Sequence, residues 1–242
     1  MALIDQLGDW APVYAKVVAE NQEQFNRLTS VVKAARTSTT VYPDSGEVLR
    51  AFKLTQLKNV KIVIIGQDPY HNGAATGLAF GVRQGFKINP SLQIIYRELL
   101  RSHSLESFEN FDYSLEHWAR QGVLLLNTTL TVEKGRPNIH QSHWEWFTKA
   151  MIKELTVRRS GLIFMLWGKY AKEAFLPIIK EANELEAANH ITLLAGHPAA
   201  EVYNPGSKLF YGTNCFVKAN EILSTDPLAT QIDWLGGNNP TL

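Results

Sequence analysis

Four short, unbroken apolar runs constrain the fold of this 242-residue chain more than any other feature. They are Lys61–Gly66, Val123–Asn127, Leu162–Gly168 and Ile191–Gly196. None of them alternates polar and apolar residues, and such runs are typical of strands buried on both faces of a parallel sheet. Amphipathic stretches with helical spacing separate them. The sequence therefore predicts an α/β fold in which helices cover a parallel sheet on both faces.

Helices are expected in five stretches of the chain. One of them carries a proline in its interior, and we expect an interruption at Pro177 because proline lacks the N–H that a helix needs. No repeat, low-complexity block or linker divides the sequence, so residues 1–242 are expected to form a single domain. The expected helices are Tyr14–Lys33, Ser91–Ser102, a helix opening at Ser114 and ending near Gly122, Trp144–Val157, and Tyr170–Ala188.

Composition excludes several classes of protein. Hydrophobic residues make up 45% of the chain and charged residues 19%, which excludes a disordered chain. The only cysteine, Cys215, excludes an internal disulfide framework and a cysteine-rich zinc site. A net charge of +1 argues against a nucleic-acid binder that depends on a large basic excess, but it allows an enzyme with a local basic patch.

The chain shows no sign of a membrane or export segment. Its longest apolar run, Leu162–Trp167, is too short to span a bilayer. The N-terminal stretch carries Asp5 and Asp9 and lacks the charged and apolar regions of a signal peptide. We therefore expect a soluble, cytoplasmic protein.

Polar side chains follow each of the four apolar runs. Asp68 comes after the first, Asn127 ends the second, Lys169 follows the third and His197 follows the fourth. Ligands of open α/β sheets bind beyond the carboxyl ends of the strands, so these groups are expected to converge on one edge. Each also has a purely structural reading: a turn at Asp68, a helix cap at Asn127, and a loop histidine bonded to a carbonyl at His197.

Other catalytic patterns are weak in this sequence. His140 and His143 lack evident third and fourth metal ligands, so a polar loop is the better interpretation. The glycines between Gly73 and Gly81 match neither a phosphate loop nor a dinucleotide fingerprint. The chain has no G-x-S-x-G motif, which argues against a serine hydrolase.

Several motifs together resemble the family 1 uracil-DNA glycosylases. The resemblance covers about Leu49 to Asn220 and implies a four-stranded parallel sheet between helices. It also implies a monomeric, metal-free DNA-repair enzyme without a cofactor, whose partners are uracil-containing DNA and a proteinaceous inhibitor of the family. The motifs are Gly66-Gln67-Asp68-Pro69-Tyr70-His71, Gly77-Leu78-Ala79-Phe80, Asn89-Pro90-Ser91-Leu92, Leu124-Leu125-Leu126-Asn127-Thr128, Trp144-Glu145, Leu166-Trp167-Gly168 and Gly196-His197-Pro198.

The resemblance implies a role for each residue of the pocket. Phe80 would stack on an extruded uracil, and Asn127 would bind its O4 and N3–H edge. Tyr70 would stand against C5 and exclude the methyl group of thymine, while Gln67 would help to hold the base. Asp68 would orient the attacking water or take its proton, and His197 would donate a hydrogen bond to uracil O2. The base must leave the duplex to reach such a pocket.

The segment after His197 departs from the family pattern. Ala199 stands where a phosphate-contacting serine is usual, and Glu201 stands where a leucine usually wedges into the duplex. Because a carboxylate is repelled by phosphates and cannot fill an apolar gap, we expect Tyr203 or Val202 to plug the gap on a longer loop that reaches Lys208. The alternative is a loop without a plug and a preference for single-stranded DNA.

The phosphate contacts are also expected to differ from the family pattern. Lys169 follows Trp167-Gly168 where a small polar contact is usual, and Ser91 belongs to one of the matching motifs. Lys134, Arg136 and Lys208 are expected to complete a modest basic rim.

Two other functions remain open at this point: a glycosylase with shifted damage specificity and a DNA-binding or partner-binding module without catalysis. The acid at Asp68 argues against the second, because binding alone does not need a group that activates water. Cleavage of a uracil-containing oligonucleotide, with thymine, hypoxanthine and abasic controls, separates the three.

Overall fold

The computed structural model describes residues 3–203 and 209–236. Its centre is a four-stranded parallel sheet with the strand order β3-β2-β5-β6. Each strand lies within one of the four predicted apolar runs, so the expected α/β fold with a central parallel sheet is confirmed. The strands are β2 Ile62–Gly66, β3 Val123–Asn127, β5 Ile163–Trp167 and β6 Ile191–Ala195.

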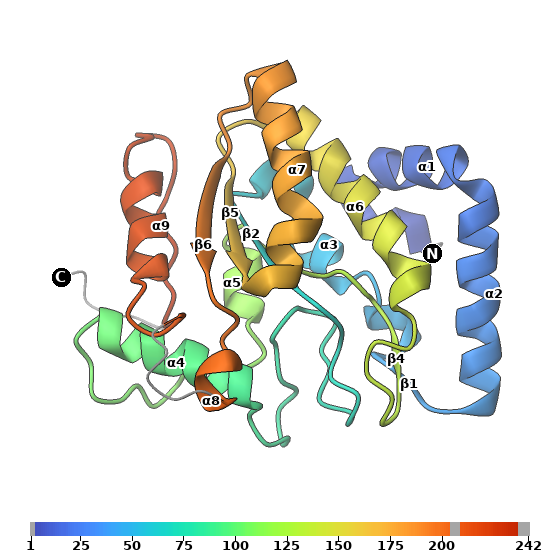
Figure 1. Cartoon of the computed structure of the whole chain (residues 1–242), viewed down its shortest axis with the longest axis horizontal. Helices are drawn as coiled ribbons and strands as arrows, with labels where there is room; N and C mark the ends of the chain where they lie inside the picture. The colour runs from blue at the N-terminus through green and yellow to red at the C-terminus, as the bar shows by residue number, and fades with distance from the viewer. Residues whose placement is uncertain (1–2, 204–208, 237–242) are drawn as a thin grey trace.

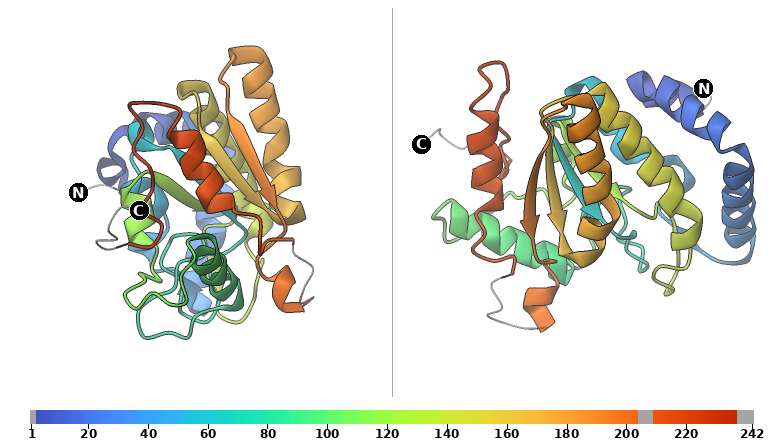
Figure 2. Two further views of the ribbon diagram at one scale, coloured as in Figure 1. Left: turned by 90° about the vertical axis from the view of Figure 1, so that its left-hand side faces the viewer. Right: turned by 45° about the horizontal axis from the view of Figure 1, so that its top comes forward.

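Helices lie on both sides of the sheet (Figures 1 and 2), which gives the expected three layers. Helices α6 and α7 pack together on one side, and α7 contacts β5 and β6. On the other side α9 contacts β6 and α5 contacts β3, with α4 next to α9. The bounds of these helices are α4 Pro90–Ser102, α5 Glu116–Arg120, α6 Gln141–Arg158, α7 Gly168–Glu186 and α9 Cys215–Leu223.

The N-terminal region differs from the single helix predicted for Tyr14–Lys33. After η1 (Leu3–Trp10), it forms two helices, α1 (Ala11–Glu20) and α2 (Gln22–Ser38), which meet at a sharp bend (Figure 1). Asn21 leaves the helical conformation at the bend, and its amide nitrogen donates a hydrogen bond to the carbonyl of Val17 at 2.9 Å. An asparagine competes with the helix backbone in this way, so the prediction of one continuous helix was wrong.

The predicted interruption at Pro177 is also wrong. Helix α7 runs from Gly168 to Glu186 without a break. Phe175 and Ile179, on either side of the proline, are fully buried. Their packing offsets the cost of proline in a helix, which is about 3 kcal/mol.

Strand β6 is less buried than the sequence predicts. Ile191 is 38% exposed and Leu194 is 49% exposed, whereas β2, β3 and β5 are buried along their whole length. Both β3 and β6 are edge strands, but β3 is covered along its whole length and β6 is covered only in part. The unbroken apolar run was therefore misleading for this strand.

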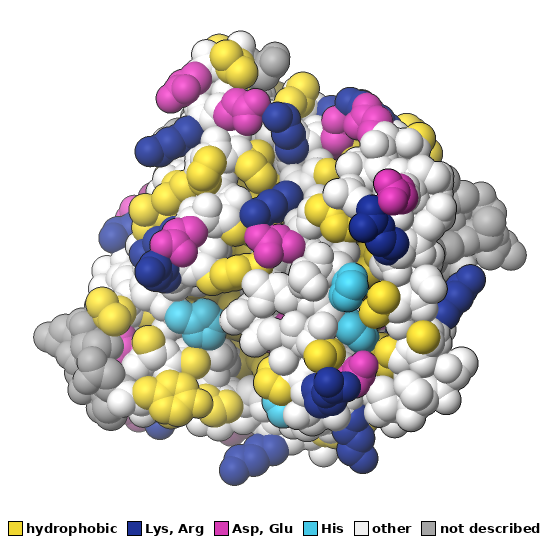
Figure 3. All heavy atoms as spheres, turned by 45° about the vertical axis from the view of Figure 1, so that its right-hand side comes forward, with side chains coloured by type: hydrophobic (Ala, Val, Ile, Leu, Met, Phe, Trp, Pro, Cys, Tyr) yellow, Lys and Arg dark blue, Asp and Glu magenta, His cyan; other side chains and the backbone are white. Residues whose placement is uncertain are grey.

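The remaining elements are short. A two-residue pairing joins β1 (Val41–Tyr42) to β4 (Val132–Glu133). In the described part of the chain, no helix is both long enough and apolar enough to cross a membrane. Acidic and basic side chains are interspersed over the face drawn in Figure 3, in keeping with the net charge of +1. The other helical turns are η2 Ser45–Glu47, α3 Arg50–Leu54, η3 Leu57–Asn59 and α8 Ala200–Tyr203.

Candidate active site

A cavity of about 350 Å³ opens at the carboxyl ends of the central strands. The register of the parallel strands places Gly66 beside Asn127 and Trp167 beside Ala195, so the loops that follow these strands start at one edge. Asp68, Phe80, Asn127 and His197 line this one cavity, whereas Lys169, which was expected to converge with the acid, the amide and the imidazole, does not line it. Residues that line the cavity include Gln67, Asp68, Tyr70, Phe80, Ser91, Asn127, Pro137, His197 and Tyr203.

Asn127 is held at the end of β3 by the neighbouring strand. Its side chain is almost fully buried, and a Cβ atom placed on Gly66 would lie 2.2 Å from Asn127 Oδ1. Beyond the strand, the Thr128 hydroxyl donates to the Gln67 carbonyl at 2.8 Å. The sheet thus fixes the amide, and only glycine at position 66 leaves it room.

Phe80 forms the aromatic wall of the cavity. Its backbone has φ = 65°, a left-handed conformation that costs a residue with a side chain about 1–3 kcal/mol. Its ring packs against Trp167 at 5.3 Å and lies 6.1 Å from the His197 ring, both between ring centroids. The Tyr70 hydroxyl donates to the Phe80 carbonyl at 3.1 Å. The strained backbone is therefore stabilised from two sides.

Burial controls the protonation of Tyr70. It raises the pKa of the Tyr70 hydroxyl to about 12, although a hydrogen bond from Asn89 acts in the opposite direction. The side chain is thus a neutral phenol at physiological pH, and its hydrogen bond to the carbonyl of Phe80 fixes the ring at the cavity wall.

Asp68 is partly buried beside the loop after β4. Burial raises the pKa of its carboxyl group, while the backbone N–H of Asn138 and the charge of His71 lower it. The Asn138 N–H donates to Asp68 Oδ2 at 2.9 Å. This bond orients a carboxylate whose affinity for a proton is higher than that of an exposed aspartate, which suits a group that takes a proton from water.

His197 follows β6, and a hydrogen bond determines which of its ring nitrogens carries the proton. The backbone N–H of Ala199 donates to His197 Nδ1 at 3.1 Å, so Nδ1 is unprotonated and the proton of the neutral ring lies on Nε2. Burial lowers the pKa of the imidazole, which favours the neutral form. A Cβ on Gly168 would lie 2.9 Å from His197 Cβ, so this glycine lets the histidine approach β5. The ring offers a neutral N–H donor.

The predicted DNA-contact residues occupy different environments. Ser91, in the first turn of α4, lines the cavity, and so does Tyr203, which is 83% exposed. Val202 is exposed beside it, and Ala199 begins the turn that leads into α8. Lys169 is exposed at the start of α7, 3.6 Å from the Glu173 carboxylate.

Glu201 does not lie with the exposed residues of this segment. Its side chain is 8% exposed, and Oε1 accepts hydrogen bonds from the backbone N–H groups of Phe210 at 2.9 Å and Tyr211 at 3.4 Å. The carboxylate is directed into the protein, which corrects the expectation of a DNA-facing side chain. The rest of the expected long loop, 204–208 with Lys208, lies outside the described residues.

Sequence reasoning missed two contributors to the site. Asn138 supplies the N–H for Asp68 from 70 positions away, and Trp167 supports Phe80 from behind.

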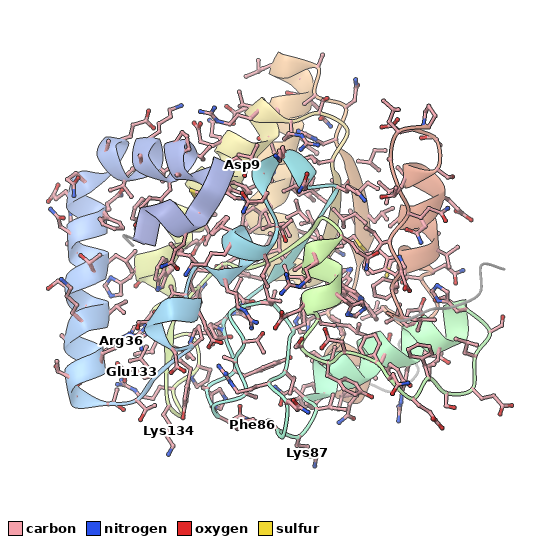
Figure 4. All side chains as sticks on the ribbon, turned by 180° about the vertical axis from the view of Figure 1, so that it is seen from behind. Asp9, Arg36, Phe86, Lys87, Glu133 and Lys134 are labelled. Atoms are coloured by element: carbon pink, nitrogen blue, oxygen red, sulfur yellow. The ribbon has the colours of Figure 1, made fainter. Side chains whose placement is uncertain are left out.

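In Figure 4, Lys87 and Lys134 extend from loops at the same end of the molecule. Of these two lysines, sequence reasoning had identified only Lys134.

Comparisons with known proteins agree with this geometry. Residues 52–224 match the family described as the uracil DNA glycosylase superfamily. A uracil-DNA glycosylase of Francisella philomiragia is 40% identical over 93% of this chain and 99% of its own length. One of Escherichia coli K12 is 42% identical over 90% of this chain and 93% of its own length.

Solved structures show the same fold. The crystal structure of mimivirus uracil-DNA glycosylase has a TM-score of 0.81 at 23% identity, covering 97% of this chain and 89% of its own. A variant of that enzyme in complex with UGI has a TM-score of 0.82. From the family match, the close relatives and a cavity built from the expected residues, we conclude that this chain belongs to the uracil-DNA glycosylase superfamily.

Proposed function

We propose that the protein is a uracil-DNA glycosylase that flips uracil out of DNA and hydrolyses its N-glycosidic bond, leaving an abasic site for base excision repair. The observation that carries the proposal is the meeting of Asp68, Phe80, Asn127 and His197 in one cavity. A protein that only binds DNA has no use for a partly buried carboxylate that shares a cavity with an imidazole N–H donor.

Base recognition rests on three walls of the cavity. The Phe80 ring stacks on the face of the base, an interaction worth about 1–3 kcal/mol per base. The Asn127 amide pairs with O4 and N3–H, so cytosine leaves buried polar groups unpaired. Tyr70 stands against C5 and excludes the methyl group of thymine, and Gln67 helps to hold the base.

The hydrolysis needs an anion near C1′ and a donor near uracil O2. As the C1′–N1 bond breaks, positive charge develops on the sugar and negative charge on the departing uracil. The Asp68 carboxylate stabilises the sugar cation and takes a proton from the water that attacks C1′. The neutral Nε2–H of His197 donates to O2 and stabilises the leaving uracil anion.

We propose that Tyr203, with Val202 beside it, fills the gap that the flipped base leaves in the duplex. Tyr203 lies at the mouth of the cavity and is 83% exposed, as a side chain that inserts into DNA must be. On this proposal Tyr203→Ala lowers excision from duplex DNA more than from single-stranded DNA. An unchanged ratio of the two rates in Tyr203→Ala and Val202→Ala would contradict it.

We further propose that Ser91, Lys169 and the backbone around Ala199 contact phosphates, with Lys134 at the rim. Ser91 lines the cavity, Lys169 lies at the start of α7 directly after β5, and Ala199 lies shortly after β6. The binding constant should then fall steeply as the salt concentration rises. We also propose a single-domain, monomeric enzyme that works in the cytoplasm and binds the proteinaceous inhibitor of its family.

The role of Asp68 provides the test of the proposed reaction. Asp68→Asn should retain binding to a uracil-containing oligonucleotide while excision falls at least about a hundredfold, the scale of a lost general base. Matched thymine, hypoxanthine and abasic oligonucleotides distinguish uracil excision from a shifted specificity. Wild-type protein that binds uracil-containing DNA but releases no base would overturn the proposal.

A further inference from the structure

Two buried carboxylates from different helices hold the backbone of residues 210–214. Glu201 of α8 accepts from the N–H groups of Phe210 and Tyr211. Glu98 of α4 accepts from the N–H groups of Gly212 at 2.7 Å and Asn214 at 2.8 Å. We call residues 210–214 the anchored turn. A backbone without regular secondary structure is thus fixed by charge-assisted hydrogen bonds.

The two carboxylates differ in what else they join. Glu98 also forms a bidentate pair with Arg101 of its own helix, with both bonds at 2.8 Å, and it therefore ties the anchored turn to α4. Glu201 lies only four residues after His197, on the far side of the turn that carries Ala199. It therefore ties α8 to residues 210 and 211 of the anchored turn.

This connection continues into the active site. The N–H groups of Ala200 and Glu201 donate to the carbonyls of His197 at 2.9 Å and Pro198 at 3.2 Å, so α8 grows directly from the histidine turn. The ring of Phe210, to whose backbone Glu201 is bonded, packs on Trp167 at 4.9 Å between centroids, and Trp167 supports Phe80. Movement of Glu201 relative to Phe210 would therefore displace Tyr203 from the mouth of the cavity.

We propose that Glu201 is a positioning residue, whose buried carboxylate ties α8 to Phe210 and Tyr211 and thereby presets Tyr203 over the cavity. The proposal rests on the proposed function. A side chain at this position that inserted into DNA would have to be exposed, whereas Glu201 is almost fully buried. Position 201 thus holds α8 in place, and insertion is left to the exposed side chain of Tyr203.

The test is a double-mutant cycle of Glu201→Ala and Tyr203→Ala, read as kcat/KM on duplex and single-stranded uracil oligonucleotides. Glu201→Ala should lower kcat/KM on the duplex about tenfold, the factor for one lost hydrogen bond to a charged group, mainly through KM. The single-strand value should change less than about threefold. In the Tyr203→Ala background, the duplex effect of Glu201→Ala should largely disappear, because the group that it positions is gone.

Two further variants complete the test. Glu201→Gln keeps an oxygen that accepts both N–H bonds, so it should retain most of the duplex activity. If Glu201→Ala does not fold, Glu201→Asp takes its place, because its shorter side chain withdraws the carboxylate from Phe210. Glu184→Ala, at an exposed position of α7, is the matched control.

The proposal would be overturned if Glu201→Ala lowered kcat/KM on the duplex by the same factor with and without Tyr203→Ala. So would equal losses on duplex and single-stranded DNA. Failure of the proposed function is a separate outcome, because it would appear in the wild-type protein as an absence of uracil release from either substrate.

Discussion

The pocket and the loop after β6 are positioned by different means. Asn127 is set by the register of β3 on β2, and Asp68 and His197 by the strand ends that carry them together with one backbone N–H each. The loop is instead held by side-chain carboxylates that reach backbone groups, Glu201 to Phe210 and Glu98 to Gly212. Residues at the ends of the strands can change little without altering the pocket. A loop that is anchored by a few side chains can change its sequence while the pocket stays intact.

The largest expected effect comes from releasing the anchored turn, residues 210–214. Glu98→Ala removes the acceptor for two backbone N–H groups and the carboxylate partner of Arg101, which keeps its hydrogen bond to Asn214 Oδ1. Because Arg101 is 31% exposed and regains water, we expect the free energy of unfolding to fall by about 2–4 kcal/mol. Urea denaturation measures the change, with the exposed Glu109→Ala as control. A loss no larger than that of the control would show that the turn is held by other contacts.

The second-largest expected effect distinguishes the contribution of the pocket to excision from that of the loop. Gly66→Ala places a Cβ 2.2 Å from Asn127 Oδ1, so the amide must move away from the position that reads uracil. We expect kcat/KM for uracil excision to fall about a hundredfold on single-stranded and duplex DNA alike. Gly46→Ala is the matched control, since a Cβ there meets no atom within 4 Å. A loss confined to the duplex would contradict the assignment of Asn127 to the pocket.

The smallest expected effect concerns pH. Burial raises the pKa of Asp68 above its usual 3.8, so a larger fraction is protonated at mildly acidic pH, and a protonated Asp68 cannot take a proton from water. The pKa of His197 is lowered, so its ring becomes protonated only at a lower pH than an exposed histidine with the usual pKa of 6.5. The acid limb of log kcat/KM should therefore have a midpoint above 3.8.

The pH profile is measured on single-stranded substrate, where the loop contributes least, and circular dichroism at each pH shows whether the protein stays folded. A midpoint at or below 3.8 would mean that Asp68 is not the titrating group or that it is fully exposed in the complex.

The pocket could be predicted from the sequence because its residues follow strands that the apolar runs reveal. Asp68, Asn127 and His197 each come at the end of a run, and parallel strands end at one edge. Periodicity could not show that Ile191 is exposed, because the unbroken apolar runs of the buried edge strand β3 and the partly exposed edge strand β6 look alike. It also missed the bend at Asn21, which depends on a side-chain hydrogen bond.

The inward direction of Glu201 had no sequence signal. A carboxylate at the position where the family carries a wedge was expected to face the DNA, since the pattern of residues does not report burial. Its two hydrogen bonds reach residues nine and ten positions further along the chain. The Asn138 N–H that orients Asp68 was equally invisible, because any residue except proline supplies a backbone N–H.

The most direct test of the central claim compares uracil and thymine at the same position of a single-stranded oligonucleotide. The single strand removes the contribution of the loop, so only the cavity of Asp68, Tyr70, Phe80, Asn127 and His197 discriminates. The wild-type protein should convert the uracil strand to an abasic strand and leave the thymine strand intact. Equal release of both bases, or no release of uracil, would contradict the account.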